Sequence, residues 1–247
     1  MSGNVDGIRK IAGGVTAAKG FKAASTAAGI KYRDRKDMAL IYSEAPCKSA
    51  GTFTSNIVKA APVKWDKNQV TGNVPARTVV INAGIASACT GEEGMGYCSQ
   101  TADAAAAVLG IPAESVLVAS TGVIGKQLPM DKIKAGIEAM APLLDGGTDS
   151  GTEASKAIMT TDTKNKVVAV QFELGGVTVT MGGMCKGSGM IHPNMCTMLS
   201  FVTTDAAISK EMLQEALSED IKDTYNMISV DGDTSTNDTV LLLANGL

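Results

Sequence analysis

The sequence is poor in histidine and in aromatic side chains. His192 is the only histidine among 247 residues, and aromatic residues make up 4% of the chain. A Ser-His-Asp or Cys-His arrangement would therefore have to use His192, which lies in a turn bounded by Pro193. Zinc sites with several histidine ligands are excluded, and the scattered cysteines lack paired ligand spacing. The sequence argues against a histidine-based triad and predicts no metal site.

Long apolar runs and blocks of one charge are also missing. No apolar run approaches the roughly 18 residues needed to cross a bilayer, and the net charge is only -3, from 22 basic and 25 acidic residues. The five cysteines include no C-x-x-C pair, which is typical of proteins in a reducing compartment. The first 20 residues lack the apolar core of a secretory signal. We therefore expect a cytoplasmic protein that binds neither nucleic acid nor membranes.

Segments with strand and helix patterns alternate along the chain. Apolar runs bounded by Gly, Pro or Asn predict strands at Met38–Tyr42, Thr78–Ile81, Val116–Ala119, Val167–Phe172, Met198–Val202 and Thr239–Ala244. Alanine-rich or amphipathic stretches predict helices at Thr101–Leu109, Asp131–Leu144 and Glu153–Met159. Gly175-Gly176 predicts a two-residue hairpin turn. The predicted class is mixed α/β, with helices covering a substantially antiparallel sheet.

A further helix is expected after Ser209, a good N-cap residue. Its predicted apolar face consists of Met212, Leu213, Ala216, Leu217 and Ile221.

A threonine is the nucleophile that fits a chain with so little histidine. An N-terminal threonine can use its own α-amine as the base, because that amine has a pKa of about 7.7–8.0. Thr197 opens an apolar run after a glycine-rich stretch, a Pro-Asn bend and the small residue Cys196. It would have to be freed by cleavage of the preceding peptide bond. Spacing alone, however, fits an ordinary loop that leads into a strand.

Eight ordered blocks make the chain similar to a known family. They are Gly13–Thr16 with Gly20-Phe21, Asp37–Ile41, Ala50–Thr54 with Ala60–Val63, Ala88–Gly91, Ser120–Gly125, Met159–Thr163, Lys186–Phe201 and Ser229–Asp238. Over these blocks, which run nearly from end to end, the chain resembles the ornithine acetyltransferase family of arginine biosynthesis. The family is also called bifunctional glutamate N-acetyltransferase/amino-acid acetyltransferase. The resemblance implies a layered, self-processing fold of the N-terminal-nucleophile kind.

The resemblance also implies where the chain is cut. The family's scissile bond falls between Cys196 and Thr197, so that residues 1–196 form an α chain and residues 197–247 the start of a β chain, much of which is absent here. The family usually has alanine before the threonine. Cys196 is small enough that we expect cleavage to survive.

The family's site residues fall on Thr197 and on four further positions. Thr197 corresponds to the nucleophile, Thr121 and Gly122 to the donors that stabilise the oxyanion, and Thr160 and Lys186, together with Thr197, to the substrate contacts. Acetyl would pass from N-acetylornithine to glutamate through acetyl-Thr197. Some members also accept acetyl-CoA, no metal or bound cofactor is required, and the family suggests an α₂β₂ heterotetramer.

Two alternatives stay open at the level of the sequence. One is an aminopeptidase or amidase of the same self-processing architecture, which passes the acyl group to water. The other is a truncated, non-catalytic fragment. The block Asp231–Asp238 is dense in carboxylates and hydroxyls, and Asx-turn chemistry explains it better than metal binding.

Overall fold

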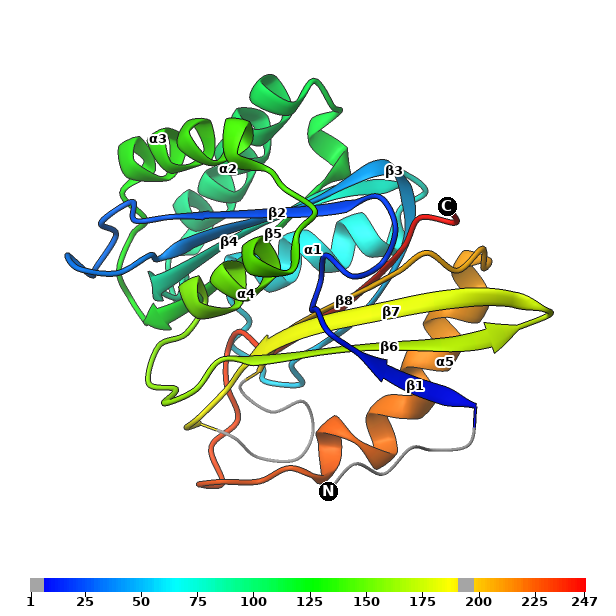
Figure 1. The fold of residues 1–247 in the computed structure, drawn as a ribbon. Helices are drawn as coiled ribbons and strands as arrows, with labels where there is room; N and C mark the ends of the chain where they lie inside the picture. Colours follow the sequence, from blue (N-terminus) through cyan, green and yellow to red (C-terminus); the bar gives the residue numbers. More distant parts are fainter. Residues whose placement is uncertain (1–6, 191–197) are drawn as a thin grey trace.

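The computed structural model describes residues 7–190 and 198–247. A nine-stranded sheet runs through the molecule in the order β1-β6-β7-β8-β9-β3-β4-β5, with β2 paired to β3 (Figure 1). The strands are β1 (Ile8–Ile11), β2 (Phe21–Thr26), β3 (Met38–Phe53), β4 (Ala76–Ile85), β5 (Val116–Val123), β6 (Lys166–Leu174), β7 (Val177–Lys186), β8 (Leu199–Thr204) and β9 (Thr239–Ala244). The helices are α1 (Ala61–Thr71), α2 (Gly91–Leu109), α3 (Met130–Met140), α4 (Thr148–Ala157) and α5 (Lys210–Asp223), with 3₁₀ turns at Ala113–Ser115, Ala141–Leu143 and Tyr225–Met227.

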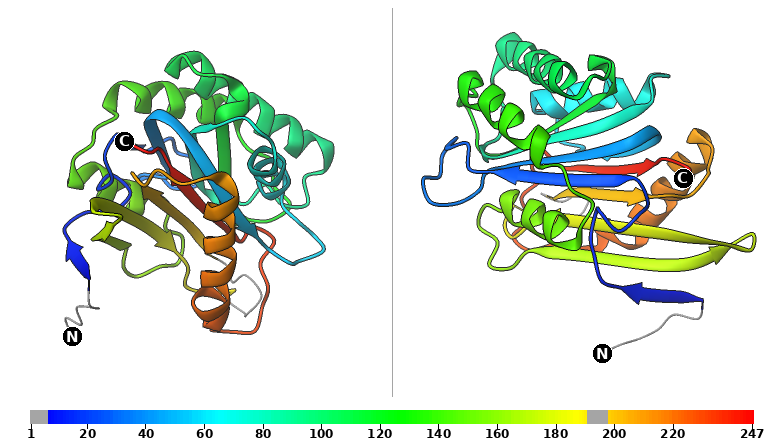
Figure 2. Two further views of the ribbon diagram at one scale, coloured as in Figure 1. Left: turned by 90° about the vertical axis from the view of Figure 1, so that its right-hand side faces the viewer. Right: turned by 45° about the horizontal axis from the view of Figure 1, so that its top comes forward.

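The long strand β3 divides the sheet into two halves. Its first part pairs with β2 and β4, and its last part, Lys48–Phe53, pairs with β9. The register with β4 shifts between Tyr42 and Cys47, and the two halves face each other (Figure 2). An irregularity of this kind bends a strand, so one chain segment belongs to both halves.

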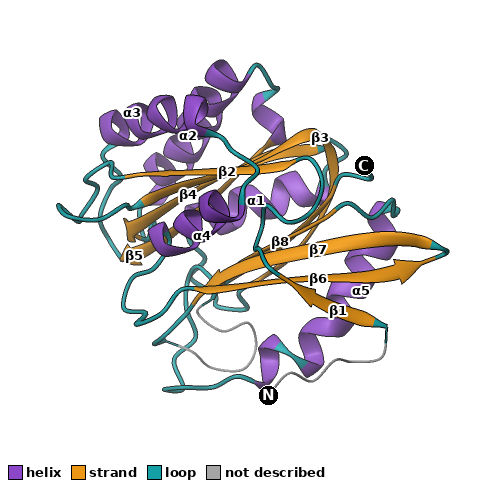
Figure 3. Cartoon of the chain, viewed as in Figure 1, coloured by secondary structure: helices purple, strands orange, loops and turns teal. Residues whose placement is uncertain are grey.

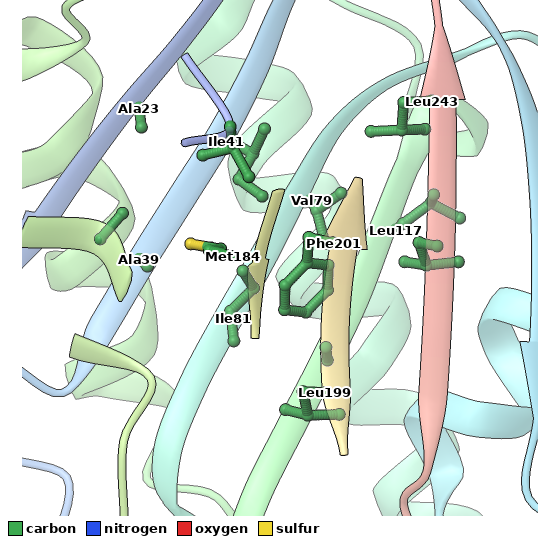
Figure 4. Close-up of a cluster of buried hydrophobic side chains, with 14 of the residues drawn as sticks. Ala23, Ala39, Ile41, Val79, Ile81, Leu117, Met184, Leu199, Phe201 and Leu243 are labelled. Atoms are coloured by element: carbon green, nitrogen blue, oxygen red, sulfur yellow. The ribbon is translucent and has the colours of Figure 1, made fainter. Parts of the chain in front are cut away.

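The main core lies between these two halves. Side chains from β2, β3, β4 and β5 meet side chains from β7, β8 and β9 (Figure 4). Phe201 on β8 is 1% exposed and Leu117 on β5 is also 1% exposed. Burying such side chains stabilises each by roughly 1.5–3 kcal/mol. This core fixes β8 against the strands of the other half.

Helices α2, α3 and α5 cover the two outer faces, whereas α4 packs into the main core through Ala154 and Ala157. A second core joins α2 and α3 to the half that contains β3, β4 and β5, and a third joins α5 to β3 and β9 (Figure 3). The order of layers is helix, sheet, sheet, helix. This arrangement confirms the predicted mixed α/β class. Most strand pairs are antiparallel, whereas β4 with β5 and β8 with β9 are parallel. No helix within the described ranges has both the length and the apolar character that a membrane span requires.

The predicted elements are all present, with different limits. The Gly175-Gly176 turn joins antiparallel β6 and β7, and both glycines have positive φ, 60° and 81°. Ser209 caps α5, since its hydroxyl accepts the Met212 N–H at 3.2 Å. The helix predicted from Thr101 begins earlier, at Gly91. The first turns of α2 are polar and carry no apolar stripe, so the sequence pattern did not predict them.

One predicted face is partly wrong. In α5, Leu213, Leu217 and Ile221 are buried, but Met212 is 61% exposed and Ala216 is exposed too. The helix packs on the sheet through one narrow stripe with a spacing of four residues, which leaves no room for the neighbouring positions.

Candidate functional site

The end of β5 holds the Thr121-Gly122 pair. Thr121 is 5% exposed, and Gly122 lies opposite Gly84 of the parallel strand β4. Gly122 has a φ of 134°, and a Cβ there would lie 2.2 Å from the Gly84 carbonyl carbon. Only glycine fits this position, because the left-handed region and the close approach both exclude a side chain.

A buried polar network supports this strand end. The Ser120 hydroxyl donates to Asn82 Oδ1 at 2.6 Å, and Asn82 Nδ2 donates to the Ile85 carbonyl at 2.9 Å. Asn237 Nδ2 donates to the Ser120 carbonyl at 2.8 Å and to the Ala86 carbonyl at 2.6 Å. The backbone immediately before Thr121 is therefore held by side chains from two other segments.

The beginning of β8 is held by the beginning of β9. The Met198 N–H donates to Asp238 Oδ1, and the Thr239 N–H donates to the Met198 carbonyl, both at 3.0 Å. Met198 directly follows Thr197 in the sequence. Thr197 itself, with Cys196 and His192, lies outside the described residues, so these positions stay predictions.

Asp238 is an unusually placed carboxyl group. It is 1% exposed, and its Oδ2 atom has no hydrogen-bond partner in the described part of the chain. Burial raises its pKa to about 8, against the opposing effects of the Met198 N–H, the Lys186 charge and the nearby Ser235. Ser235 favours the charged form of the Asp238 carboxyl group, although it forms no hydrogen bond to Oδ2. The carboxyl group can therefore hold or release a proton near neutral pH.

Lys186 is the last residue of β7 and pairs with Leu199, the first residue of β8. It is 4% exposed. Burial lowers its pKa, while the charges of Asp162 and Asp238 oppose that change. None of the ion pairs between described residues includes it. A buried cation of this kind is suited to binding a carboxylate of a ligand.

Asp162 brings the Thr160 segment next to β7. Its carboxylate accepts the Gly187 N–H at 2.8 Å, the Thr160 N–H at 3.3 Å and the Lys166 ammonium at 2.7 Å. Burial alone would raise the pKa of Asp162, but these hydrogen bonds lower it overall. One carboxylate thus binds both the backbone of Thr160 and that of Gly187, the residue after Lys186.

Contacts link the segments that carry the four described residues of the predicted site, whose roles stay predictions. Asn237 binds the carbonyl of Ser120, the residue before Thr121, and its neighbour Asp238 interacts electrostatically with Lys186. Sequence reasoning missed the roles of Asn82, Asp162, Asn237 and Asp238. The polar density of the block Asp231–Asp238 was the available signal for the last two, whereas Asn82 lies inside an apolar strand with no distinguishing pattern.

The described residues include no group of three or more His, Cys, Asp or Glu side chains arranged to hold a metal ion. A cavity of about 660 Å³ lies elsewhere, between α5 and the strands β6, β7 and β8. Valine, methionine and glycine residues form much of its lining, and none of the described site residues contributes to it.

Comparison with known proteins identifies relatives over almost the whole chain. The chain is 55% identical over 240 residues to the arginine biosynthesis bifunctional protein ArgJ of Symbiobacterium thermophilum, covering 96% of this chain and 59% of that protein. It is 51% identical to the Thermotoga neapolitana protein of the same name, covering 93% of this chain and 57% of that protein. The chain thus spans somewhat more than half the length of these relatives.

Two solved structures are also similar to this chain. The arginine biosynthesis bifunctional protein ArgJ of Bacillus halodurans is 40% identical, with a TM-score of 0.73 over 78% of this chain and 98% of that one. Ornithine acetyltransferase of Mycobacterium tuberculosis, complexed with ornithine, is 41% identical, with a TM-score of 0.69 over 78% of this chain and 100% of that one.

The fold extends to a more distant protein. The L-aminopeptidase D-Ala-esterase/amidase of Ochrobactrum anthropi, a variant of the Ntn hydrolase fold, is 13% identical with a TM-score of 0.58. The match covers 96% of this chain and 76% of that protein. At this level of identity it shows only that the two folds are alike. The ArgJ family model matches residues 22–247, and this chain therefore belongs to the ArgJ family.

Proposed function

We propose that this chain is part of a self-cleaving acetyltransferase that moves acetyl from N-acetylornithine to glutamate, with Thr197 as the nucleophile. The observation that carries the proposal is the chain of contacts that runs from the Ser120 carbonyl, next to Thr121, through Asn237 and Asp238 to the beginning of β8 and the charge of Lys186. The ornithine bound to the Mycobacterium tuberculosis relative supports a substrate related to ornithine.

The first reaction is cleavage between Cys196 and Thr197, which divides the chain into residues 1–196 and a segment beginning at residue 197. The Thr197 hydroxyl attacks the Cys196 carbonyl, the acyl group moves from nitrogen to oxygen, and the C–N bond breaks as the nitrogen gains a proton. Water then hydrolyses the ester. The products are a new carboxylate on Cys196 and a free α-amine on Thr197 that can act as a base near neutral pH.

The second reaction is acetyl transfer by a ping-pong route. The Thr197 hydroxyl takes acetyl from N-acetylornithine, ornithine leaves, and the amine of glutamate removes acetyl from the threonine. Thr121 and Gly122 donate to the oxyanion of each tetrahedral intermediate, and losing one such donor typically costs roughly 10²–10³ in rate. Lys186 and Thr160 hold the substrate. Both amino-acid substrates carry a carboxylate, which suits the buried Lys186 cation.

The proposal extends to four properties of the whole enzyme. No bound cofactor takes part, the cleaved chains assemble as an α₂β₂ heterotetramer, and the enzyme works in the cytoplasm, while acetyl-CoA is a candidate for an additional donor. Native mass spectrometry of the cleaved material tests the assembly, and replacing N-acetylornithine with acetyl-CoA tests the donor.

An acetyl-transfer assay with a matched pair of lysine variants tests the function. The chain is supplied with N-acetylornithine, with and without glutamate, alone and together with a polypeptide covering the part of the Symbiobacterium relative that it does not span. We expect ornithine release that depends on glutamate and yields N-acetylglutamate. Lys186→Met should lower the rate by about tenfold or more, whereas Lys67→Met, at an exposed position of α1, should change it little. Ornithine release that ignores glutamate would instead identify an amidase.

A further inference from the structure

Asn237 holds the oxyanion side of the site from a distant part of the sequence. It is 6% exposed, and both hydrogens of its side-chain amide are used, one on the Ser120 carbonyl and one on the Ala86 carbonyl. The Thr236 hydroxyl donates to Asn237 Oδ1 at 2.6 Å. Two carbonyl acceptors and one hydroxyl donor fix which end of the amide faces the strand. The Ser120 carbonyl belongs to the peptide bond that leads into Thr121.

Asp238 holds the nucleophile side. Its Oδ1 accepts the Met198 N–H, while Thr54 N–H donates to the backbone carbonyl of Asp238 at 2.9 Å. The Asp238 side chain and the Thr239 N–H together bind both backbone groups of Met198. These contacts fix the backbone immediately after the proposed nucleophile.

We propose that Asn237 and Asp238 are positioning residues that set the beginning of β8 against the Thr121-Gly122 end of β5. The two residues are consecutive, so their Cα atoms are about 3.8 Å apart. A single peptide unit therefore separates the residue that binds the Ser120 carbonyl from the one that binds the Met198 N–H. This inference rests on the proposed function, because it concerns the self-cleavage at Thr197.

Cleavage makes such positioning necessary on both sides of the reaction. Before the cut, the Thr197 hydroxyl must approach the Cys196 carbonyl. In this proposal Thr121 and Gly122 are the oxyanion donors of the cleavage step as well, at about 2.7–3.1 Å from the developing charge. After the cut, Thr197 is a chain terminus, and termini are poorly ordered unless they are tied down. The Asp238 contact is on the first amide after that terminus. A misplacement of about 1 Å can cost about 10²-fold in rate.

Variants at Asn237 give the first test, with the rate of self-cleavage followed by intact mass. Asn237→Asp keeps the shape but turns a carboxylate oxygen towards the Ser120 and Ala86 carbonyls, which it repels when ionised. We expect cleavage about tenfold slower than in the parent or more at pH 8. The ratio of variant to parent rate should recover as the pH falls, because the protonated carboxyl group regains a donor. A pH-independent ratio would contradict the assigned role of the amide.

Variants at Asp238 separate positioning from direct acid-base chemistry. Asp238→Ala removes the acceptor of the Met198 N–H and should slow cleavage by about tenfold or more. Asp238→Asn keeps an acceptor oxygen in the same place and should restore most of the rate. If Asp238→Asn is as slow as Asp238→Ala, the carboxyl group itself is required and the positioning role is wrong.

Asp205→Ala is the matched control. The Asp205 carboxylate accepts the Thr180 N–H at 2.7 Å beyond the opposite end of β8, so its loss should lower the melting temperature without slowing cleavage. If the parent is cut and the Asn237 and Asp238 variants are cut equally fast, the positioning proposal is overturned while the proposed function stands. An uncut parent overturns the proposed self-cleavage and this role together.

Discussion

At both ends of strands β7, β8 and β9 an aspartate side chain accepts a backbone N–H, but the two aspartates differ in how completely they are hydrogen-bonded. At one end, the Asp238 side chain binds the Met198 N–H, and at the other, the Asp205 side chain binds the Thr180 N–H. Asp205 uses both oxygens, since Oδ2 accepts the Lys19 N–H at 3.2 Å. Asp238 is buried with one oxygen left without a hydrogen-bond partner among the described residues.

The glycines near the two ends also differ, in how closely other backbone atoms approach them. Gly175 and Gly176 turn the hairpin with open space around them, whereas a side chain at Gly122, two residues after the β5 carbonyl that Asn237 binds, would overlap the backbone of Gly84. One end therefore needs only a chain reversal, and the other keeps close backbone contacts and an incompletely bonded carboxyl group. Costly local arrangements of this kind are concentrated at functional sites.

The largest expected difference between the ends concerns their glycines. Gly122→Ala places a methyl group against the Gly84 backbone at positive φ and should reduce the free energy of unfolding by about 3 kcal/mol or more. Gly175→Ala meets no neighbouring atom and should cost only about 1–2 kcal/mol for its left-handed φ. Thermal unfolding of both variants checks the order. Equal losses would show that the close approach of β4 and β5 is not needed.

The second difference is a pH dependence at Asp238. Folding raises the pKa of this carboxyl group from about 4 to about 8, so the folded state holds a proton that the unfolded state releases. The contribution of Asp238 to stability should therefore fall as the pH rises from about 4 to about 8, by an amount of the order of a few kcal/mol. Denaturant unfolding across this range should show a flatter profile for Asp238→Asn than for the parent. Asp205→Asn serves as the control. A parent profile that falls no more steeply than that of Asp238→Asn would contradict the buried, protonated state of Asp238.

The smallest effect is expected at Asp162. Its pKa is lowered, so its stabilising contribution is present above about pH 4 and is lost as the pH falls through the folded-state value. The Lys166 side chain is 44% exposed, which limits the ion pair to at most about 1 kcal/mol. Asp162→Asn should be less stable than the parent at pH 7, and the gap should shrink at pH 3. A gap of the same size at both pH values would argue against the charge of Asp162.

The sequence predicts much of the fold because hydrophobic period and turn chemistry are local properties. The Gly175-Gly176 hairpin, the Ser209 cap and the strand Thr239–Ala244 follow from neighbouring residues alone. The exposed Met212 was mispredicted because the width of a buried helix face depends on the surface it packs against.

The candidate site is only partly readable from the sequence. Thr121, Gly122, Thr160 and Lys186 came from family resemblance. The roles of Asn237 and Asp238 depend on hydrogen bonds to residues far away in the chain, such as Ser120 and Met198. No local pattern encodes a pairing over such distances, so the block Asp231–Asp238 predicted only turns.

The most direct test of the account is the chemical state of the purified chain. Intact mass and N-terminal sequencing should find two polypeptides, one of which begins Thr-Met-Leu-Ser at Thr197. The Thr197→Ala variant should remain one chain. A parent that stays uncut on prolonged incubation, or a Thr197→Ala chain that is still cleaved before residue 197, would contradict the assignment of Thr197 as the nucleophile.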